Sequence, residues 1–354
     1  KECLDKGWLA GFGEMTVEFE ERVSKLFGKE YGVFVNSGSS AILLALCVID
    51  LKKGDEVITP ACGFATTVSP IIQLGATPVF CDVEPTTYVP SVESILECIT
   101  EKTKCILIPN LIGNVIDWKL LREKTDLILI EDSADTITHT PYSDISTTSF
   151  YSSHLITAGG TGGMVMFNKK EEVNRCLMFR DWGRIGNNIE DVSERFNHTV
   201  DGIEYDFKFL YGALGYNMKC SEMNAAFGLG QLDRLDEIKE KRRKVFERYL
   251  ERLKDSKIYT LPDDSKKPNW LAIPFCCKNR LQLLTFLEEN NVQTRVCFAG
   301  NITRHPVYRE YLKEFKVSDK IMAEGFLLGA HHGMTMDDVD YVCDLLIKFE
   351  KENQ

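Results

Sequence analysis

The chain has 354 residues, a formal net charge of −11 at pH 7 and a sequence pI near 5.2. This length predicts a large α/β unit with a smaller unit beside it rather than one small domain. The acidic balance is the opposite of the clustered Lys and Arg that a nucleic-acid backbone or an anionic membrane surface requires, so we expect neither as a partner.

The cysteines and the N-terminus indicate the compartment. Twelve cysteines are scattered through apolar runs such as residues 45–48 and 104–107, which is typical of buried thiols in a reducing compartment. No pair has CxxC spacing, so we expect no structural metal. Residues 1–9 lack a secretion-signal core, and no apolar run approaches the roughly 20 residues of a membrane helix. We therefore expect a cytoplasmic protein.

The first half of the chain alternates helical patterns with short apolar runs. Residues 16–27 and 39–51 have helical spacing, and the second of these helices opens with a serine pair suited to a cap. Seven runs rich in β-branched residues predict strands at residues 32–35, 56–59, 78–83, 104–108, 127–130, 145–151 and 164–167. Strands that alternate with helices build a mostly parallel sheet.

The second half begins with a long charged helix, predicted from Ser221 to about Leu253. It carries the charged run 239–244, which is typical of a solvated helix face. A compact α+β pattern follows to the end of the chain. We expect a boundary near Arg234, with a large domain over residues 1–234 and a small C-terminal domain over residues 235–354.

The first functional candidate is the segment Asn-Ser-Gly-Ser-Ser-Ala at residues 36–41, between a predicted strand and a helix. A helix N-terminus with glycine and hydroxyl groups presents free N–H donors and the positive end of the helix dipole, which suit a phosphate. Gly38, Ser39 and Ser40 are therefore candidate phosphate ligands. Ordinary helix capping explains this segment equally well when it is taken alone.

The second candidate is acidic and follows the strand at residues 127–130. Glu131, Asp132 and Asp135 lie where a parallel strand ends, which is the usual location of site residues in such sheets. A carboxylate buried there is costly unless it is paired. The alternative is an acidic pair that caps a helix.

The third candidate is His154, in the stretch Ser-Phe-Tyr-Ser-Ser-His at residues 149–154, which leads to four glycines between residues 159 and 163. No lysine occurs between Asp126 and Asn168. A lone histidine at a strand end is more often structural than catalytic, yet an imidazole can carry protons in both directions near neutral pH.

Residues 149–163 resemble the cofactor segment of the sugar aminotransferases that use pyridoxal phosphate (PLP), the DegT/DnrJ/EryC1/StrS type. In that family a small hydroxyl residue and two aromatic residues precede the lysine that binds PLP covalently. His154 occupies the lysine position. This replacement resembles the nucleotide-linked 4-keto-6-deoxyhexose 3-dehydratases, of which the colitose-pathway GDP-4-keto-6-deoxymannose enzymes are the nearest parallel. Residues 179–184, 205–208, 268–270 and 293–306 extend the resemblance over most of the chain.

The resemblance implies the PLP-dependent transferase fold type I, with a three-layer αβα large domain and a mostly parallel seven-stranded sheet. A small α+β C-terminal domain completes each subunit of a homodimer with shared active sites. The implied cofactor residues are Gly38, Ser39, Ser40 and Ser149 at the phosphate, Phe64 on the ring, Asp132 at the pyridine nitrogen, Asp135 near the phenolic oxygen or the substrate, and Asn217 reaching the partner's phosphate.

The resemblance also implies substrate contacts at Arg184, Asn301 and Arg304. The alternatives are a core phenylalanine at Phe64 and surface ion pairs of little energetic worth at the basic residues.

The implied reaction is dehydration at C3 of a nucleotide-sugar substrate, with the amine form of the cofactor, pyridoxamine phosphate (PMP), and with His154 moving protons. L-glutamate is the implied amino donor. Relatives that bind a [2Fe-2S] cluster carry cysteines where this chain has Ala134 and residues 185–188, so we expect no iron-sulfur cluster. The altered glycine turn and Leu155, where relatives have a second histidine, leave the substrate open.

Two other functions remain open. A sugar-nucleotide aminotransferase acting at C4 conflicts with the missing lysine. A catalytically inactive PLP-binding homologue conflicts with the presence of Asp132, Ser149 and the phosphate segment, since an inactive site would be free to lose them.

Overall fold

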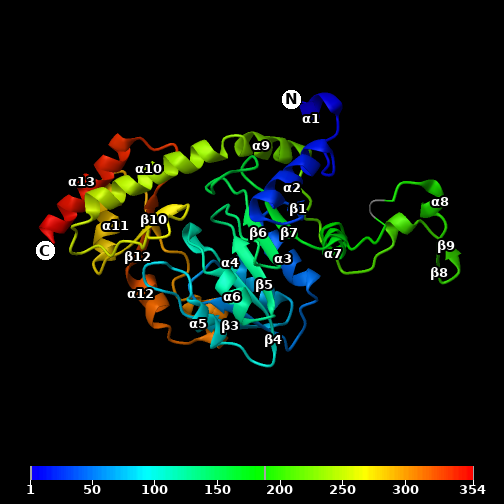
Figure 1. The fold of residues 1–354 in the computed structure, drawn as a ribbon, viewed down its shortest axis with the longest axis horizontal. Helices are drawn as coiled ribbons and strands as arrows, with labels where there is room; N and C mark the ends of the chain where they lie inside the picture. Colours follow the sequence, from blue (N-terminus) through cyan, green and yellow to red (C-terminus); the bar gives the residue numbers. More distant parts are fainter. Residues whose placement is uncertain (1, 187–188, 354) are drawn as a thin grey trace.

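A seven-stranded sheet forms the centre of the computed structural model, which describes residues 2–186 and 189–353 (Figure 1). The strand order is β1-β7-β6-β5-β4-β2-β3, and only the pairs β1·β7 and β7·β6 are antiparallel. The mostly parallel sheet is therefore confirmed. The strands are β1 (Tyr31–Val35), β2 (Glu56–Pro60), β3 (Thr77–Cys81), β4 (Thr103–Pro109), β5 (Ile128–Ser133), β6 (Ile145–Ser149) and β7 (Gly163–Phe167).

Helices cover both faces of this sheet, which explains why its strands read as continuous apolar runs. Alternate residues of one strand reach opposite faces. Val33 of β1 packs with helices α3 and α7, whereas Phe34 packs with α2 and α9. The helices up to the end of the sheet are α1 (Glu2–Lys6), α2 (Glu14–Phe27), α3 (Gly38–Val48), α4 (Ala65–Gln73), α5 (Val92–Leu96), α6 (Trp118–Lys124) and α7 (Lys170–Arg180), with a 3-10 turn η1 (Leu111–Gly113).

The strand predictions differ from the structure only at the ends. Strand β3 ends at Cys81 rather than residue 83, and β6 ends at Ser149 rather than residue 151. The predicted cap of the second helix was wrong: α3 is capped by Ser37, whose Oγ accepts a 3.1 Å hydrogen bond from the Ser40 N–H.

The single helix predicted from Ser221 to Leu253 is wrong, because the structure divides it into α9 (Glu222–Leu232) and α10 (Leu235–Leu253). Arg234 leaves helical geometry, with φ −110° and ψ 6°. The break coincides with the domain boundary that we propose. Helix α10 runs from the central sheet toward the C-terminal elements (Figure 1).

The C-terminal elements form an antiparallel sheet in the order β10-β12-β11 with helices around it. A common apolar core joins Ile108 and Leu129 of the central sheet to Phe246 of α10 and Phe326 of β12. These elements are β10 (Ala272–Cys276), α11 (Arg280–Glu289), β11 (Arg295–Val296), η3 (Ile302–Arg304), η4 (Pro306–Tyr311), α12 (Lys316–Glu324), β12 (Gly325–Gly329) and α13 (Met336–Glu352).

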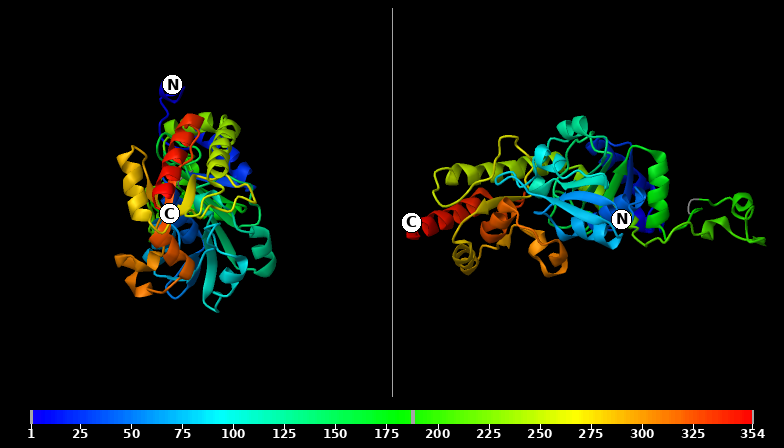
Figure 2. Two further views of the ribbon diagram at one scale, coloured as in Figure 1. Left: turned by 90° about the vertical axis from the view of Figure 1, so that its left-hand side faces the viewer. Right: turned by 90° about the horizontal axis from the view of Figure 1, so that it is seen from below.

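An arm between α7 and α9 projects away from the central sheet in two perpendicular views (Figures 1 and 2). It carries α8 (Val192–Arg195), the two-residue strands β8 (Thr199–Val200) and β9 (Ile203–Glu204), and η2 (Phe207–Phe209). Large apolar side chains remain exposed along it, and Leu214 is 96% exposed.

Two composition-based expectations can be compared with the described residues. All twelve cysteines are free thiols, and eleven of them are buried. Within residues 2–186 and 189–353, no helix combines the length and the apolar character needed to span a membrane.

Candidate active site

The N-termini of α3 and α4 meet beside the carboxyl ends of the parallel strands. Ser40 Oγ donates to Asn36 Oδ1 at 2.7 Å, and Ser39 Oγ donates to Thr66 Oγ1 at 2.8 Å. The Asn36 carbonyl accepts the Gly162 N–H at 3.0 Å. The predicted phosphate segment, the start of α4 and the glycine turn are thus held together by hydrogen bonds.

Gly38 and Ser149 are in direct contact. A Cβ atom built on Gly38 would lie 2.7 Å from Ser149 Cβ and 3.2 Å from its Oγ. Gly163 is equally constrained, because its Cβ would lie 2.3 Å from the Ser37 carbonyl. The glycines let the end of β6 approach the start of α3, which brings the Ser149 hydroxyl to the helix N-terminus.

Asp132 lies at the carboxyl end of β5 and is 5% exposed. Its Oδ2 accepts a hydrogen bond from Thr67 Oγ1 at 2.8 Å, and its Oδ1 accepts the Ala134 N–H at 3.2 Å. Burial raises the pKa of Asp132 to about 6 despite these two donors. No cationic side chain is among its hydrogen-bond partners in the described ranges. Such a carboxylate suits a bound cationic group.

Asp135 is buried two residues beyond the end of β5. Its Oδ2 accepts the Ile112 N–H at 2.7 Å, and burial raises its pKa to about 6. Ile112 holds a left-handed backbone conformation, with φ 59° and ψ 9°. That conformation is a genuine outlier for a β-branched residue.

His154 lies in the turn after β6, with 17% of its side chain exposed. Its Nε2 is 3.8 Å from Asp135 Oδ1. Its Nδ1 is buried, without a hydrogen-bond partner within the described part of the chain. Burial lowers the pKa of His154 to about 4, so the ring is neutral at pH 7. A neutral imidazole with an unprotonated nitrogen can accept a proton.

Phe64 caps the start of α4, and its side chain is 54% exposed. Its ring makes an edge contact with Phe298, with centroids 6.3 Å apart. The core alternative for Phe64 is therefore wrong, since much of its ring faces outward. An exposed aromatic face near a buried carboxylate suits a flat aromatic ligand.

Asn217 and Arg184 lie where the arm joins the sheet. Asn217 is exposed, and the Asn36 N–H donates to the Met218 carbonyl at 2.9 Å, so this segment adjoins the phosphate segment of its own chain. The Arg184 guanidinium lies over the rings of Trp182 and Phe209, at 4.6 and 4.5 Å.

The other two predicted substrate residues lie near η3. Asn301 is fully buried and caps η3; its Nδ2 donates to Asp319 Oδ1 at 2.8 Å. Arg304 is exposed and forms a bidentate pair with the same Asp319. Asn301 thus shapes the loop, and Arg304 is the member of the pair that reaches the surface.

Three residues at the site were not found from the sequence. The sequence did hold a signal for Thr67, because it follows Phe64 by three residues and three residues are close to one helical turn. Ile112 gave no signal. Arg242 lies in the charged run, where the prediction of a solvated face was wrong for this residue, which is 4% exposed.

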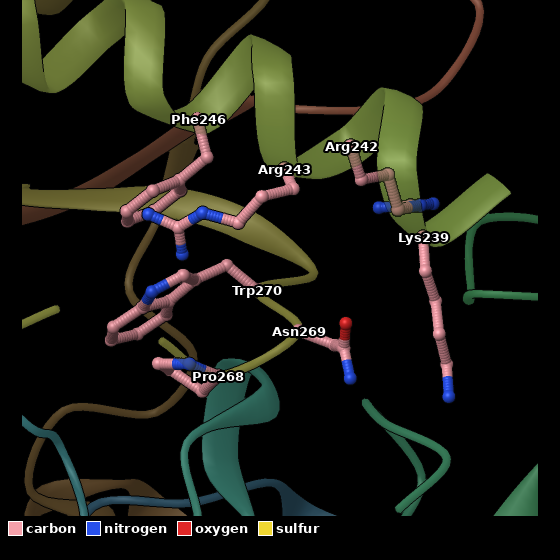
Figure 3. A pocket seen from close by; sticks show the side chains of 7 residues that line it. All are labelled: Lys239, Arg242, Arg243, Phe246, Pro268, Asn269 and Trp270. Carbon is pink, nitrogen blue, oxygen red and sulfur yellow. The ribbon is translucent and has the colours of Figure 1, made fainter. Parts of the chain in front are cut away.

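Arg242 contacts three backbone carbonyls from separate segments. Its Nη1 donates to Leu271 at 2.9 Å and to Ala330 at 3.4 Å, and its Nη2 donates to His154 at 3.3 Å. Figure 3 shows Arg242 on α10 opposite Asn269 and Trp270. This arginine links the histidine turn to the C-terminal elements.

The assembled site suits a flat cationic ring that carries a phosphate. It offers a helix N-terminus with hydroxyls, an outward-facing phenyl ring and a buried carboxylate. In the described ranges no group of three or more His, Cys, Asp or Glu side chains could hold a metal ion. Asn187 and Asn188, on which the expected absence of cluster cysteines partly rests, lie outside the described residues.

Comparison with known proteins identifies the family. The model of the DegT/DnrJ/EryC1/StrS aminotransferase family matches residues 1–347. The chain is 37% identical to the lipopolysaccharide biosynthesis protein RfbH of Salmonella typhimurium, over 98% of this chain and 86% of RfbH. It is 32% identical to a dTDP-4-dehydro-2,6-dideoxy-D-glucose 3-dehydratase of Saccharopolyspora spinosa, over 94% and 79%. A GDP-perosamine synthase of Vibrio cholerae is 28% identical, over 98% and 93%.

Solved structures agree with this assignment. A GDP-4-keto-6-deoxymannose-3-dehydratase variant with bound GDP-perosamine superposes with a TM-score of 0.86 at 27% identity, over 98% of this chain and 95% of that one. The same kind of enzyme with a trapped adduct of PLP and glutamate gives 0.87 at 26%, over 98% and 95%. Structural neighbours thus bind PLP or PMP, and the fold is that of the PLP-dependent aminotransferases.

Proposed function

Because this chain belongs to the DegT/DnrJ/EryC1/StrS aminotransferase family of PLP-dependent sugar-nucleotide enzymes, we propose that it is a 3-dehydratase. It removes the C3 hydroxyl of a nucleotide-linked 4-keto-6-deoxyhexose and yields the 4-keto-3,6-dideoxy sugar. One observation carries the proposal: the residue in the turn after β6 is a partly buried, neutral His154 rather than a lysine.

The residues of the site fit the cofactor. The N-terminus of α3 with Ser39, Ser40 and Ser149 binds the phosphate, and Phe64 covers one face of the ring. Asp132 pairs with the pyridine nitrogen, which neutralises the charge that burial makes costly. When it is bound, PMP supplies an amine for the C4 ketone and a ring that accepts electrons from the reacting carbon.

His154 moves the protons. Its Nδ1 is buried, so Nε2 is the nitrogen that would accept a proton from the methylene carbon of PMP and then donate it to the departing C3 hydroxyl. That hydroxyl leaves as water, and the imidazole returns to its neutral form. Arg184 and Arg304 are the proposed contacts to the nucleotide sugar, and Asn301 supports the loop of Arg304.

The arm supports a homodimer with shared active sites. Exposed apolar side chains on the arm and at its base, including Ile203, Tyr211 and Leu214, need a cover that the described residues of the chain do not provide. In this dimer Asn217 of one chain contacts the phosphate held by the other.

A C4 aminotransferase is the second candidate, because GDP-perosamine synthases are among the relatives. That activity uses a lysine to bind PLP covalently. Burial lowers the pKa of two lysines, Lys29 and Lys219, which favours the neutral amine that forms an imine. Both have other partners: Lys29 Nζ donates to the Ser143 carbonyl at 2.6 Å, and Lys219 Nζ lies 3.5 Å from Asp181 Oδ1.

The proposal is tested by following both products. In a reaction with PLP, L-glutamate and a 4-keto-6-deoxy sugar nucleotide, we expect 2-oxoglutarate and the 3-deoxygenated sugar in equal amounts, with solvent deuterium at C3. GDP-, CDP-, UDP- and dTDP-sugars are screened first by thermal shift, since a specific ligand raises the melting temperature. A 4-amino sugar as the product would establish the aminotransferase instead. Turnover that requires NADH and a reductase would show that the expectation of no iron-sulfur cluster is wrong.

The His154→Asn variant provides the control. Asparagine fills similar space but cannot shuttle a proton, so deoxygenation should fall at least about 100-fold while PMP still binds. Near-normal turnover by this variant would assign the proton transfer to another residue.

A further inference from the structure

Asp135 and His154 belong to a closed ring of contacts. Asp135 accepts the Ile112 N–H at 2.7 Å, and the Ile112 carbonyl accepts the Leu271 N–H at 2.8 Å. The Leu271 carbonyl and the His154 carbonyl both bind the guanidinium of Arg242. The ring closes with the 3.8 Å approach of His154 Nε2 to Asp135 Oδ1.

Two members of this ring, Ile112 and Arg242, are held in place at an energetic cost. Ile112 is held in a left-handed conformation that turns its N–H toward Asp135. Arg242 is buried without a carboxylate among its hydrogen-bond acceptors in the described ranges. Costs of this kind persist where the surrounding structure defines a functional geometry. The geometry defined here is the distance between the carboxylate and the imidazole.

We propose that Asp135 is the carboxylate partner of His154 and stabilises the imidazolium that forms when Nε2 accepts a proton. This inference rests on the proposed function, in which His154 holds that proton between two steps. The proton moves from carbon to Nε2 and then to the departing hydroxyl. Asp135 remains ionised throughout, so the pair is restored at the end of each turnover.

The charges around the pair set its behaviour with pH. Burial is the main reason that the pKa of His154 is lowered to about 4; a hydrogen bond with the Ser149 backbone raises this pKa, and the positive charge of Arg242 on α10 lowers it. An ionised carboxylate at this distance raises an imidazole pKa by about 1 to 3 units. Asp132 on β5 and Cys297 after β11 are the other titratable groups that interact with Asp135. The ionised Asp135 thus opposes this lowering and favours the imidazolium.

The test is a titration of the His154 ring by 15N NMR, with PMP and without it, using His154→Gln to assign the signal. In the wild type we expect the imidazole to titrate at a higher pH than in Asp135→Asn. Asp135→Asn keeps an oxygen for the Ile112 N–H but removes the charge, so the pKa of its imidazole should fall by about 1 unit or more. Asp126→Asn makes the same chemical change at an exposed residue before β5 and should match the wild type.

A reciprocal measurement covers the case in which Asp135→Asn does not fold. The Asp135 side-chain carbon should titrate together with the imidazole in the wild type and in one simple step near pH 6 in His154→Gln. An imidazole that titrates at the same pH in the wild type and in Asp135→Asn, or an Asp135 carbon that titrates identically in the wild type and in His154→Gln, would overturn the pairing. These outcomes need no substrate. A failure of the proposed reaction would instead appear as the absence of deoxygenated sugar with the pairing intact.

Discussion

The backbone of Gly38 lies so close to the side chain of Ser149 that a methyl group on Gly38 would come within 2.7 Å of Ser149 Cβ. Neither side can yield easily, because Gly38 is the first residue of α3 and Ser149 is the last residue of β6. The contact sets the spacing between the helix N-terminus and the hydroxyl that we propose bind one phosphate.

Gly38→Ala should therefore destabilise the protein by about 1–3 kcal/mol and weaken PLP binding about tenfold or more, because the methyl group pushes these two elements apart. Urea unfolding and fluorescence titration with PLP measure the two effects. The double variant Gly38→Ala/Ser149→Gly should recover stability but not affinity, since it removes the clash together with the hydroxyl.

Gly230 offers the matched control. It lies in α9 with nothing within 4 Å of a built Cβ, so Gly230→Ala should stabilise the protein by about 0.5–1 kcal/mol. Equal losses at Gly38 and Gly230 would show that the contact with Ser149 is not the cause.

PLP should bind without a covalent bond, because His154 cannot form a stable imine. Borohydride treatment of the PLP-loaded protein, followed by mass spectrometry, should leave no pyridoxyl group on any peptide. The peptides that contain Lys29 and Lys219 are decisive, since burial lowers the pKa of both amines and so favours their reactive neutral form. A pyridoxyl-lysine at either position would return the chain to the aminotransferase class.

The cofactor-free protein should lose stability as pH rises through the range in which Asp132 ionises. The folded-state pKa of Asp132 is raised to about 6, against about 3.9 in an unfolded chain, so between these values the folded state binds the proton more tightly. The loss is complete above pH 6 and amounts to about 2–3 kcal/mol. Asp132→Asn should thus be more stable than the wild type by about 1–3 kcal/mol at pH 8 and equal to it at pH 4.

Urea unfolding of both proteins at the two pH values checks this. The comparison must be with the wild type, because His154 contributes with the opposite sign: its pKa is lowered to about 4, and that contribution falls as pH drops from about 6.5. A variant less stable than the wild type at pH 8 would mean that the carboxylate is not costly. If the prediction holds, bound PLP should stabilise the wild type more than the Asp132→Asn variant, because only the wild type offers a carboxylate to the pyridine nitrogen.

Asn217 should act on the partner's cofactor, so two defective chains should complement each other. Asn217→Ala and His154→Asn are each expected to be inactive, and mixed dimers contain one site with both native residues. Activity should reappear after subunit exchange, which is verified by native mass spectrometry. No recovery after proven exchange would place Asn217 at the phosphate segment of its own chain, which it adjoins through Met218.

The sequence predicted the features that depend on neighbours along the chain. All seven strands of the central sheet were found within two or three residues of their ends, since buried parallel strands are short apolar runs. The helix break at Arg234 was missed, because the residues around it keep helical composition. The burial of Arg242 was missed as well. Its acceptors are carbonyls up to 88 residues away, and a charged run does not reveal which member turns inward.

The candidate site divides in the same way. The acids at the end of β5 were recognisable because acidic residues follow an apolar run. The approach of Asp135 to His154 was not, because it depends on Ile112, a residue with no chemical signal of its own. Asn301 is the opposite case, because its distinctive segment suggested a substrate contact, whereas in the structure its side chain caps η3.

The exposed apolar side chains of the arm should make the stability of this chain depend on protein concentration. If the proposed dimer forms, a newly made chain exposes Leu214 and its apolar neighbours to water only until it meets a second copy. Folding of the subunit and formation of the proposed dimer are then one linked equilibrium, so the melting temperature rises with the amount of protein. Dilution below the dissociation constant of the dimer would remove activity without altering any residue that touches the cofactor.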